Sequence, residues 1–146
     1  MKKIAILGLG IAMYSVSNTV LSGCSDASLG GHYEARIEAK NSDLGYTCKF
    51  NLIHGAELSP KVDFCTMNDG SIVPINYISW SLKPNCSFKI TSQFGDGRVN
   101  IVANGKFQQS DLACGFGKVK VKDSINDARY TGIFMINSVE KQCDSL

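Results

Sequence analysis

The sequence predicts an all-β fold, an antiparallel β-sandwich or small barrel of about eight strands supported by disulfides. Apolar and polar residues alternate with a period of two over most of the chain. Turn signals rich in Gly, Asn and Asp recur at short intervals. No segment sustains a helical period, and only residues 137–144 are a candidate for a short helix.

The first half of the domain predicts three strands. Residues 33–39 alternate between apolar and charged side chains, which is typical of a half-buried strand. After a turn at 41–45, residues 46–53 alternate again with Cys, Phe and Leu on one face. A loop at 54–60 then leads into a short strand at 61–67.

The middle of the chain predicts a central strand followed by a hairpin. Residues 71–82 are apolar on both faces, although Pro74 marks an edge, a bulge or the true start of this strand. A turn at 83–85 separates it from the alternating residues 86–91, and a second turn follows at 94–97.

The last part of the chain predicts four more strands. They are expected at residues 98–102, 106–109, 118–122 and 129–136. Asn104-Gly105 is interpreted as a hairpin turn between the first two of them. The polar segment 123–127 separates the last two strands.

The N-terminal segment is typical of an export signal. Met1-Lys2-Lys3 precedes 13 apolar or small residues at 4–16, a run that is too short to span a bilayer, which takes about 20 residues. We therefore expect a signal peptide at 1–23, a flexible tether at 24–31 and one β domain at 32–146.

Leu21-Ser22-Gly23-Cys24 resembles the lipobox of bacterial lipoproteins, in which a Leu and two small residues precede a Cys. The resemblance implies that Cys24 carries a diacylglycerol thioether and becomes the first residue after cleavage. It also implies a membrane partner and a place in the bacterial cell envelope, with Ser25 giving no inner-membrane retention signal. Ordinary cleavage after Ser22 or after Ala27 is the alternative, and it would give a soluble periplasmic or secreted protein.

The cysteine count bears on this choice. Lipidation of Cys24 leaves five cysteines, whereas cleavage after Ser22 leaves six and allows three disulfides. Cys48 and Cys65 lie on strands joined by one loop and are expected to pair. Cys86 and Cys114 both lie near strand starts and are a second candidate pair, which leaves Cys143 free or intermolecular.

Charge and motifs exclude several activities. Without Lys2 and Lys3 the chain has 13 basic and 13 acidic residues, which disfavours nucleic-acid binding. No cofactor or metal motif is present, and Asp123 to Asp127 departs from a calcium loop because its third residue is Ile. Of the two histidines, His32 lies at the entrance of the first strand and His54 lies in a loop.

Two weak candidates for binding remain. Lys118, Lys120 and Lys122 share one strand face, where they would contact an anionic lipid, polysaccharide or protein, or protect an exposed sheet edge. Trp80 is either an exposed contact residue or part of the core.

We therefore expect an exported, lipid-anchored envelope protein that is not an enzyme and acts as a binding or inhibitor module for an unknown protein or polysaccharide. The alternatives are a small secreted hydrolase that uses His54 and a structural subunit of a surface assembly.

Overall fold

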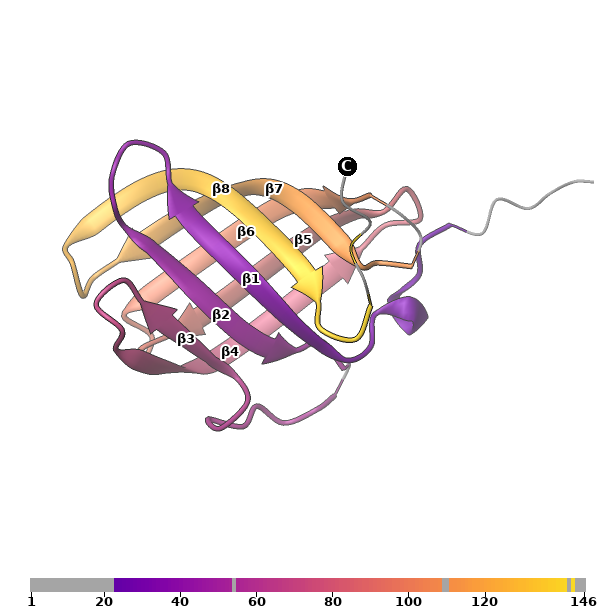
Figure 1. Cartoon of the computed structure of the whole chain (residues 1–146), viewed down its shortest axis with the longest axis horizontal. Coiled ribbons are helices and arrows are strands. Elements are labelled where there is room, and N and C mark those ends of the chain that lie inside the picture. Colours follow the sequence, from indigo (N-terminus) through magenta and orange to yellow (C-terminus); the bar gives the residue numbers. More distant parts are fainter. Residues whose placement is uncertain (1–22, 54, 109–110, 142, 144–146) are drawn as a thin grey trace, which may run out of the picture.

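The chain folds into a closed barrel of eight antiparallel strands (Figure 1). The computed structural model describes residues 23–53, 55–108, 111–141 and 143. The strands are β1 (His32–Ala39), β2 (Gly45–Asn51), β3 (Phe64–Met67), β4 (Ile72–Leu82), β5 (Ser87–Phe94), β6 (Val99–Phe107), β7 (Cys114–Asp123) and β8 (Ala128–Ser138). Each strand pairs with its neighbours in sequence, and β8 closes the barrel on β1. The expected all-β fold is confirmed, as a barrel.

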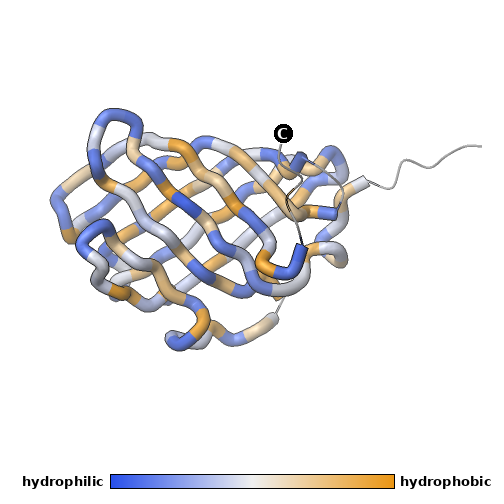
Figure 2. Tube along the Cα trace, viewed as in Figure 1, coloured by the Kyte–Doolittle hydropathy of each residue, from blue (hydrophilic) through white to orange (hydrophobic). Residues whose placement is uncertain are grey.

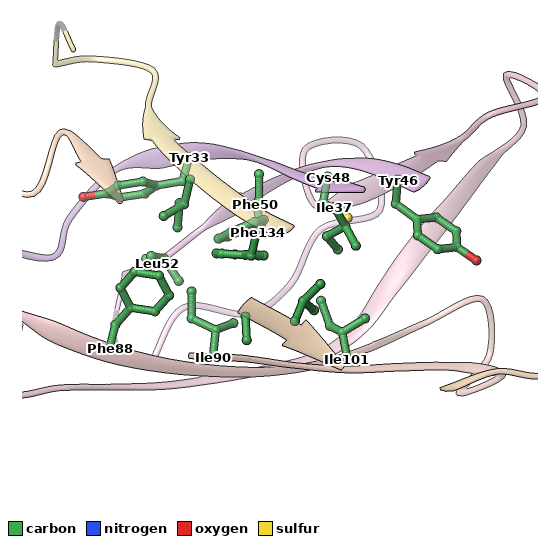
Figure 3. Close-up of a cluster of buried hydrophobic side chains, with 14 of the residues drawn as sticks. Tyr33, Ile37, Tyr46, Cys48, Phe50, Leu52, Phe88, Ile90, Ile101 and Phe134 are labelled. Atoms are coloured by element: carbon green, nitrogen blue, oxygen red, sulfur yellow. The ribbon is translucent and has the colours of Figure 1, made fainter. Parts of the chain in front are cut away.

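Alternation along the strands places one set of side chains inside the barrel. Tyr33, Phe94, Phe107 and Phe134 are among the largest fully buried side chains, and Figure 3 shows side chains from facing strands meeting in the interior. Orange and blue residues accordingly alternate along the strands in Figure 2. At about 1.5–3 kcal/mol for each large apolar side chain, this filled interior is the main source of stability.

Two sequence expectations about elements are wrong. Asn104-Gly105 is not a turn but lies inside β6, where Gly105 pairs with Phe88 of β5. A Cβ at Gly105 would lie 2.6 Å from the end of the Phe88 ring, so the glycine makes room for an aromatic side chain. The expected helix at 137–144 is absent from its described part, because β8 continues to Ser138 and no helix covers 139–141.

The wall of the barrel is least regular around β3, which has four residues. β3 pairs with only Ile72 to Pro74 of β4. Pro74 therefore lies near the start of its strand and directly before an irregularity in the β4–β5 register between Ile75 and Tyr77. Beyond Pro74, β4 continues to Leu82 with β5 as its partner.

All six cysteines form disulfides. The expected Cys48–Cys65 bond is confirmed, and it joins directly opposite residues of β2 and β3. The expected Cys86–Cys114 pair is wrong, because Cys86 bonds to Cys24 and Cys114 bonds to Cys143. Cys143 is accordingly neither free nor intermolecular in this structure. The sequence did not reveal these two bonds, because Cys24 and Cys143 both lie outside the eight strands.

In segment 24–31, for which a flexible tether is expected, two residues are held against the barrel. Asp26–Ser28 form a short 3-10 helix (η1), and Cys24 and Leu29 are buried. The Cys24 amide donates a hydrogen bond to the Pro84 carbonyl (3.1 Å), which holds the segment beside its disulfide partner in the β4–β5 turn.

The two ends of the barrel differ in what closes them. Four short turns, at 40–44, 68–71, 95–98 and 124–127, lie at one end, which we call the hairpin end. Both described chain ends lie at the other, the terminal end (Figure 1). There the His32 ring contacts Glu140 through Nδ1 and Oε1 (2.9 Å), which ties the start of β1 to the segment after β8.

Candidate binding surface

Strands β5 to β8 present a face of the barrel that carries positive charge only. We call this face the basic wall. Its charged side chains point outward because they occupy the alternate positions that do not enter the core, and all of them are exposed. They are Lys89 of β5, Lys106 of β6, Lys118, Lys120 and Lys122 of β7, and Arg129 of β8. The only acidic residue in these four strands is Asp123, which is buried.

The strand register sets the spacing of these charges. Lys118 stands between Asn104 of β6 and Ile133 of β8, and Lys122 stands between Asn100 and Arg129. Charges on β7 therefore recur about every 7 Å along the strand, and neighbouring strands lie about 4.8 Å apart. None of the six wall cations forms an ion pair within the described residues.

Barrel closure bears on one of the two interpretations of the β7 lysines, the protection of a sheet edge. β7 pairs along its whole length with β6 on one side and β8 on the other. It is not an edge strand, so protection of an exposed sheet edge does not explain its lysines. Contact of these lysines with an anionic group outside the barrel stays a prediction.

Two adjoining hollows interrupt the wall. The first, which we call the wall hollow, has a volume of about 450 Å³ and is lined by Val102 and Ile133 with Lys118 and Lys120 beside them. The second, the hairpin hollow, has a volume of about 620 Å³ and lies between the β1–β2 turn and the β7–β8 hairpin, with Arg129 in its lining. Lys40 and Lys120 line both hollows, so each has at least two cations at its border.

A buried carboxylate fixes the hairpin that carries Lys122 and Arg129. The Tyr46 hydroxyl of β2 donates to Asp123, and the amides of Ile125 (2.9 Å) and Asn126 (3.0 Å) donate to the same side chain. Burial raises the pKa of Asp123, but these hydrogen bonds outweigh burial and hold it below the ordinary 3.8. Asp123 to Asp127 is thus a hydrogen-bonded turn, and this carboxylate is occupied by structural donors.

Tyrosine pKa values in the barrel reflect burial. Burial, followed by the hydrogen bond to Asp123, raises the pKa of Tyr46 above its usual range. Burial also raises the pKa of Tyr130 to about 12, with the nearby Asp123 charge adding to the effect. Both hydroxyls therefore remain protonated at neutral pH and act as neutral groups.

The other expected site residues lie elsewhere. Trp80 of β4 is half-buried and packs against the core, which favours its core interpretation over an exposed sugar contact. The His32 side chain is engaged with Glu140. His54, the histidine of the enzyme alternative, lies outside the described residues. Among the residues that are described, no group of His, Cys, Asp and Glu side chains is arranged to hold a metal ion.

The sequence pattern found only half of the basic wall. Lys118, Lys120 and Lys122 were visible as alternate residues of one strand. The remaining wall cations are single residues on other strands, and their proximity follows from the strand order of the closed barrel. The pairing register of β5 to β8 is needed to predict that these cations lie beside the β7 lysines.

Comparisons with protein families, with curated proteins and with solved structures found no match. Within the described part of the chain, no helix has both the length and the apolar character needed to span a bilayer. Three disulfides indicate a protein that resides in an oxidising environment.

Proposed function

We propose that this chain is an exported binding protein without catalytic activity, and that its basic wall binds an anionic partner. The observation that carries the proposal is the segregation of charge. Six exposed cations and no exposed carboxylate occupy the outward positions of β5 to β8, although the chain without its first three residues is neutral. The six positive charges of the basic wall repel one another, and an anionic partner would offset this repulsion.

The magnitude of this attraction is useful for binding. An exposed ion pair contributes about 0.2–1 kcal/mol, so six pairs together reach a few kcal/mol. A field of one sign also accelerates encounter, and salt screens it over about 8–10 Å. We therefore expect binding that weakens steeply with ionic strength.

The buried carboxylates support a binding role over a catalytic one. Asp63 accepts hydrogen bonds from the amides of Asn51 and Ser59, both at 2.7 Å, and Asp123 accepts those described above. Each of these buried acids fixes a loop. A general acid or base instead needs a carboxyl group whose proton remains available to a substrate.

Charge reversal on β7 tests the role of the wall. The probe is fluorescein-labelled poly-L-glutamate, and its binding is followed by fluorescence anisotropy at low and high salt. We expect Lys118→Glu/Lys120→Glu/Lys122→Glu to abolish binding. The matched control, Lys49→Glu/Lys61→Glu/Lys83→Glu, changes the net charge equally away from the wall and should retain at least half of the affinity. Equal losses in the two variants would show that net charge alone, and not the wall, binds the probe.

We further propose that the folded protein is not anchored through Cys24, in contrast to the implication of the lipobox resemblance. A diacylglycerol thioether and the Cys24–Cys86 disulfide require the same sulfur atom. Ordinary cleavage after Ser22 leaves that sulfur available for Cys86.

Intact mass of the protein from cells tests this second proposal. We expect a chain that begins at Gly23, lacks six hydrogens relative to the reduced form and carries no acyl group. An acylated N-terminal Cys24 together with a free Cys86 thiol would overturn it.

A further inference from the structure

We infer that the partner of the basic wall is a protein that inserts an apolar side chain, flanked by carboxylates, into the wall hollow. The inference rests on the proposed function and specifies the chemistry of the partner. It follows from the position of an apolar hollow in the middle of a cationic surface.

The hollow is built on the central strand of the wall. Lys118 and Lys120 are two residues apart on β7, with Val102 on β6 at one side and Ile133 on β8 at the other. Val102 is opposite Lys120 and Ile133 is opposite Lys118, so the two aliphatic residues lie diagonally across β7. Two strand spacings across and two residues along give a separation of about 12 Å. Ile133 is 53% exposed, and its neighbours on the adjacent strands are Lys118 of β7 and the exposed Glu38 of β1.

The border of the hollow is suited to carboxylates. Lys118 and Lys120 of β7 and Lys40 of the β1–β2 turn are the cations that line it. Arg129 borders the adjoining hairpin hollow, where its planar guanidinium would bind a carboxylate through two hydrogen bonds. An apolar side chain in the wall hollow and acidic groups on either side would satisfy both kinds of surface.

The size of the wall agrees with a protein partner. Four strands at about 4.8 Å spacing and about 30 Å in length give a projected area on the order of 500 Å². The side chains that project from the wall make its accessible area larger than this projected area. One partner contributes roughly 800 Å² to a standard protein–protein interface, which is of similar size. An apolar centre within a polar border is also the usual anatomy of such interfaces.

The same features disfavour the other anionic partners. Membrane surfaces are bound by apolar side chains that project into the lipid, whereas Val102 and Ile133 line a hollow. Sugar rings pack on aromatic faces, and the residues that line the wall hollow include Asn104 and Thr131 but no aromatic side chain.

Methyl NMR titration of the intact protein tests the inference. The probes are two acetylated acidic peptides, Glu-Glu-Leu-Glu-Glu and Glu-Glu-Gly-Glu-Glu, together with phosphatidylglycerol vesicles and heparin. We expect the leucine peptide to bind about tenfold more tightly than the glycine peptide, the scale set by burying one apolar side chain. The methyl signals of Val102 and Ile133 should shift with the leucine peptide.

Matched variants distinguish the inference from the proposed function. Ile133→Ser should reduce binding of the leucine peptide to the level of the glycine peptide. The control Ile72→Ser replaces an isoleucine that is 65% exposed and lies outside the wall. This control should change the affinity for neither the leucine peptide nor the glycine peptide. Equal affinity of the two peptides, or tighter binding to the vesicles or to heparin, would overturn the inference and leave the proposed function standing. Survival of peptide binding in Lys118→Glu/Lys120→Glu/Lys122→Glu would instead overturn the proposed function.

Discussion

The two halves of the barrel are built differently. Strands β5 to β8 are eight to eleven residues long and pair along almost their whole length. In the other half, β3 has four residues and pairs with three residues of β4. A hollow of about 540 Å³ lies there between β4 and residues 55–58. The half with complete ladders is the half that carries the basic wall.

The difference shows how each half obtains its stability. The β1–β4 half has the Cys48–Cys65 disulfide within its wall and the two hydrogen bonds of Asp63 that hold the loop before β3. The β5–β8 half depends on its ladders and on aromatic packing beneath them. The following predictions test this contrast, from the largest expected effect to the smallest.

Removal of Phe88 tests the packing beneath the basic wall. Its ring lies 5.1 Å from that of Phe107 and 5.8 Å from that of Phe134, measured between centroids, and it covers Gly105. We expect Phe88→Ala to lower the free energy of unfolding by about 3–5 kcal/mol, because it leaves a cavity in the barrel. Urea denaturation measures this loss. A loss below about 1 kcal/mol would show that the β5–β8 half does not depend on this cluster.

Removal of the Cys48–Cys65 bond tests the covalent support of the other half. The bond closes a loop with a sequence separation of 17. We expect Cys48→Ala/Cys65→Ala to lower the free energy of unfolding by about 3 kcal/mol through the greater entropy of the unfolded chain. Hydrogen exchange should show faster opening in β2 and β3 than in β6 and β7. Uniform acceleration across the barrel would contradict the independence of the two halves.

Acid should weaken contacts at both ends of the barrel. The pKa of Glu140 is lowered first by the backbone hydrogen bond from His32 and then by the His32 side chain, and that of Asp123 is lowered as described above. In the folded protein the pKa of Glu140 is below its ordinary 4.5 and that of Asp123 is below its ordinary 3.8. The two carboxylates therefore stabilise the folded state fully above these ordinary values. This stabilisation is lost as pH falls through the lower pKa values of the folded state.

Thermal unfolding as a function of pH checks the acid prediction. The midpoint should fall below about pH 4.5, the upper of the two ordinary values. Glu140→Gln should make this fall shallower, while the exposed control Glu57→Gln should leave it unchanged. An identical profile for all three proteins would contradict the assignment to Glu140.

Charge reversal on the wall should affect stability least. The β7 lysines make no ion pair within the described residues and point away from the core. We expect each single Lys→Glu change at Lys118, Lys120 or Lys122 to alter the free energy of unfolding by less than about 0.5 kcal/mol. Chemical denaturation checks this. A larger loss would assign these lysines a structural role instead of a role in binding.

The sequence predicted the fold class because a period of two is visible in single strands. It left sandwich and barrel open, since closure depends on the β1–β8 pairing between residues about a hundred positions apart. The Cys48–Cys65 bond was predicted because it joins neighbouring strands. Asn104-Gly105 was misread because a glycine that accommodates an aromatic ring and a glycine that forms a turn look alike in a sequence.

The candidate site was predicted only where it follows one strand. Lys118, Lys120 and Lys122 form a local pattern, but Lys89 and Arg129 join them through strand order. Whether a lysine-rich strand lies at an edge or inside a closed ladder is likewise a property of the whole barrel. The sequence therefore could not decide between protection of an edge and binding.

The disulfides Cys24–Cys86 and Cys114–Cys143, with a hydrogen bond from Lys141 Nζ to the Ser28 carbonyl (3.4 Å), place the two described chain ends side by side. A short peptide linker would bridge them, and new ends could then be opened in any of the four turns at the opposite rim. Circular permutants of this kind would keep every strand neighbour unchanged. The architecture thus defines a circle of eight strands in which the natural starting point is only one choice among several.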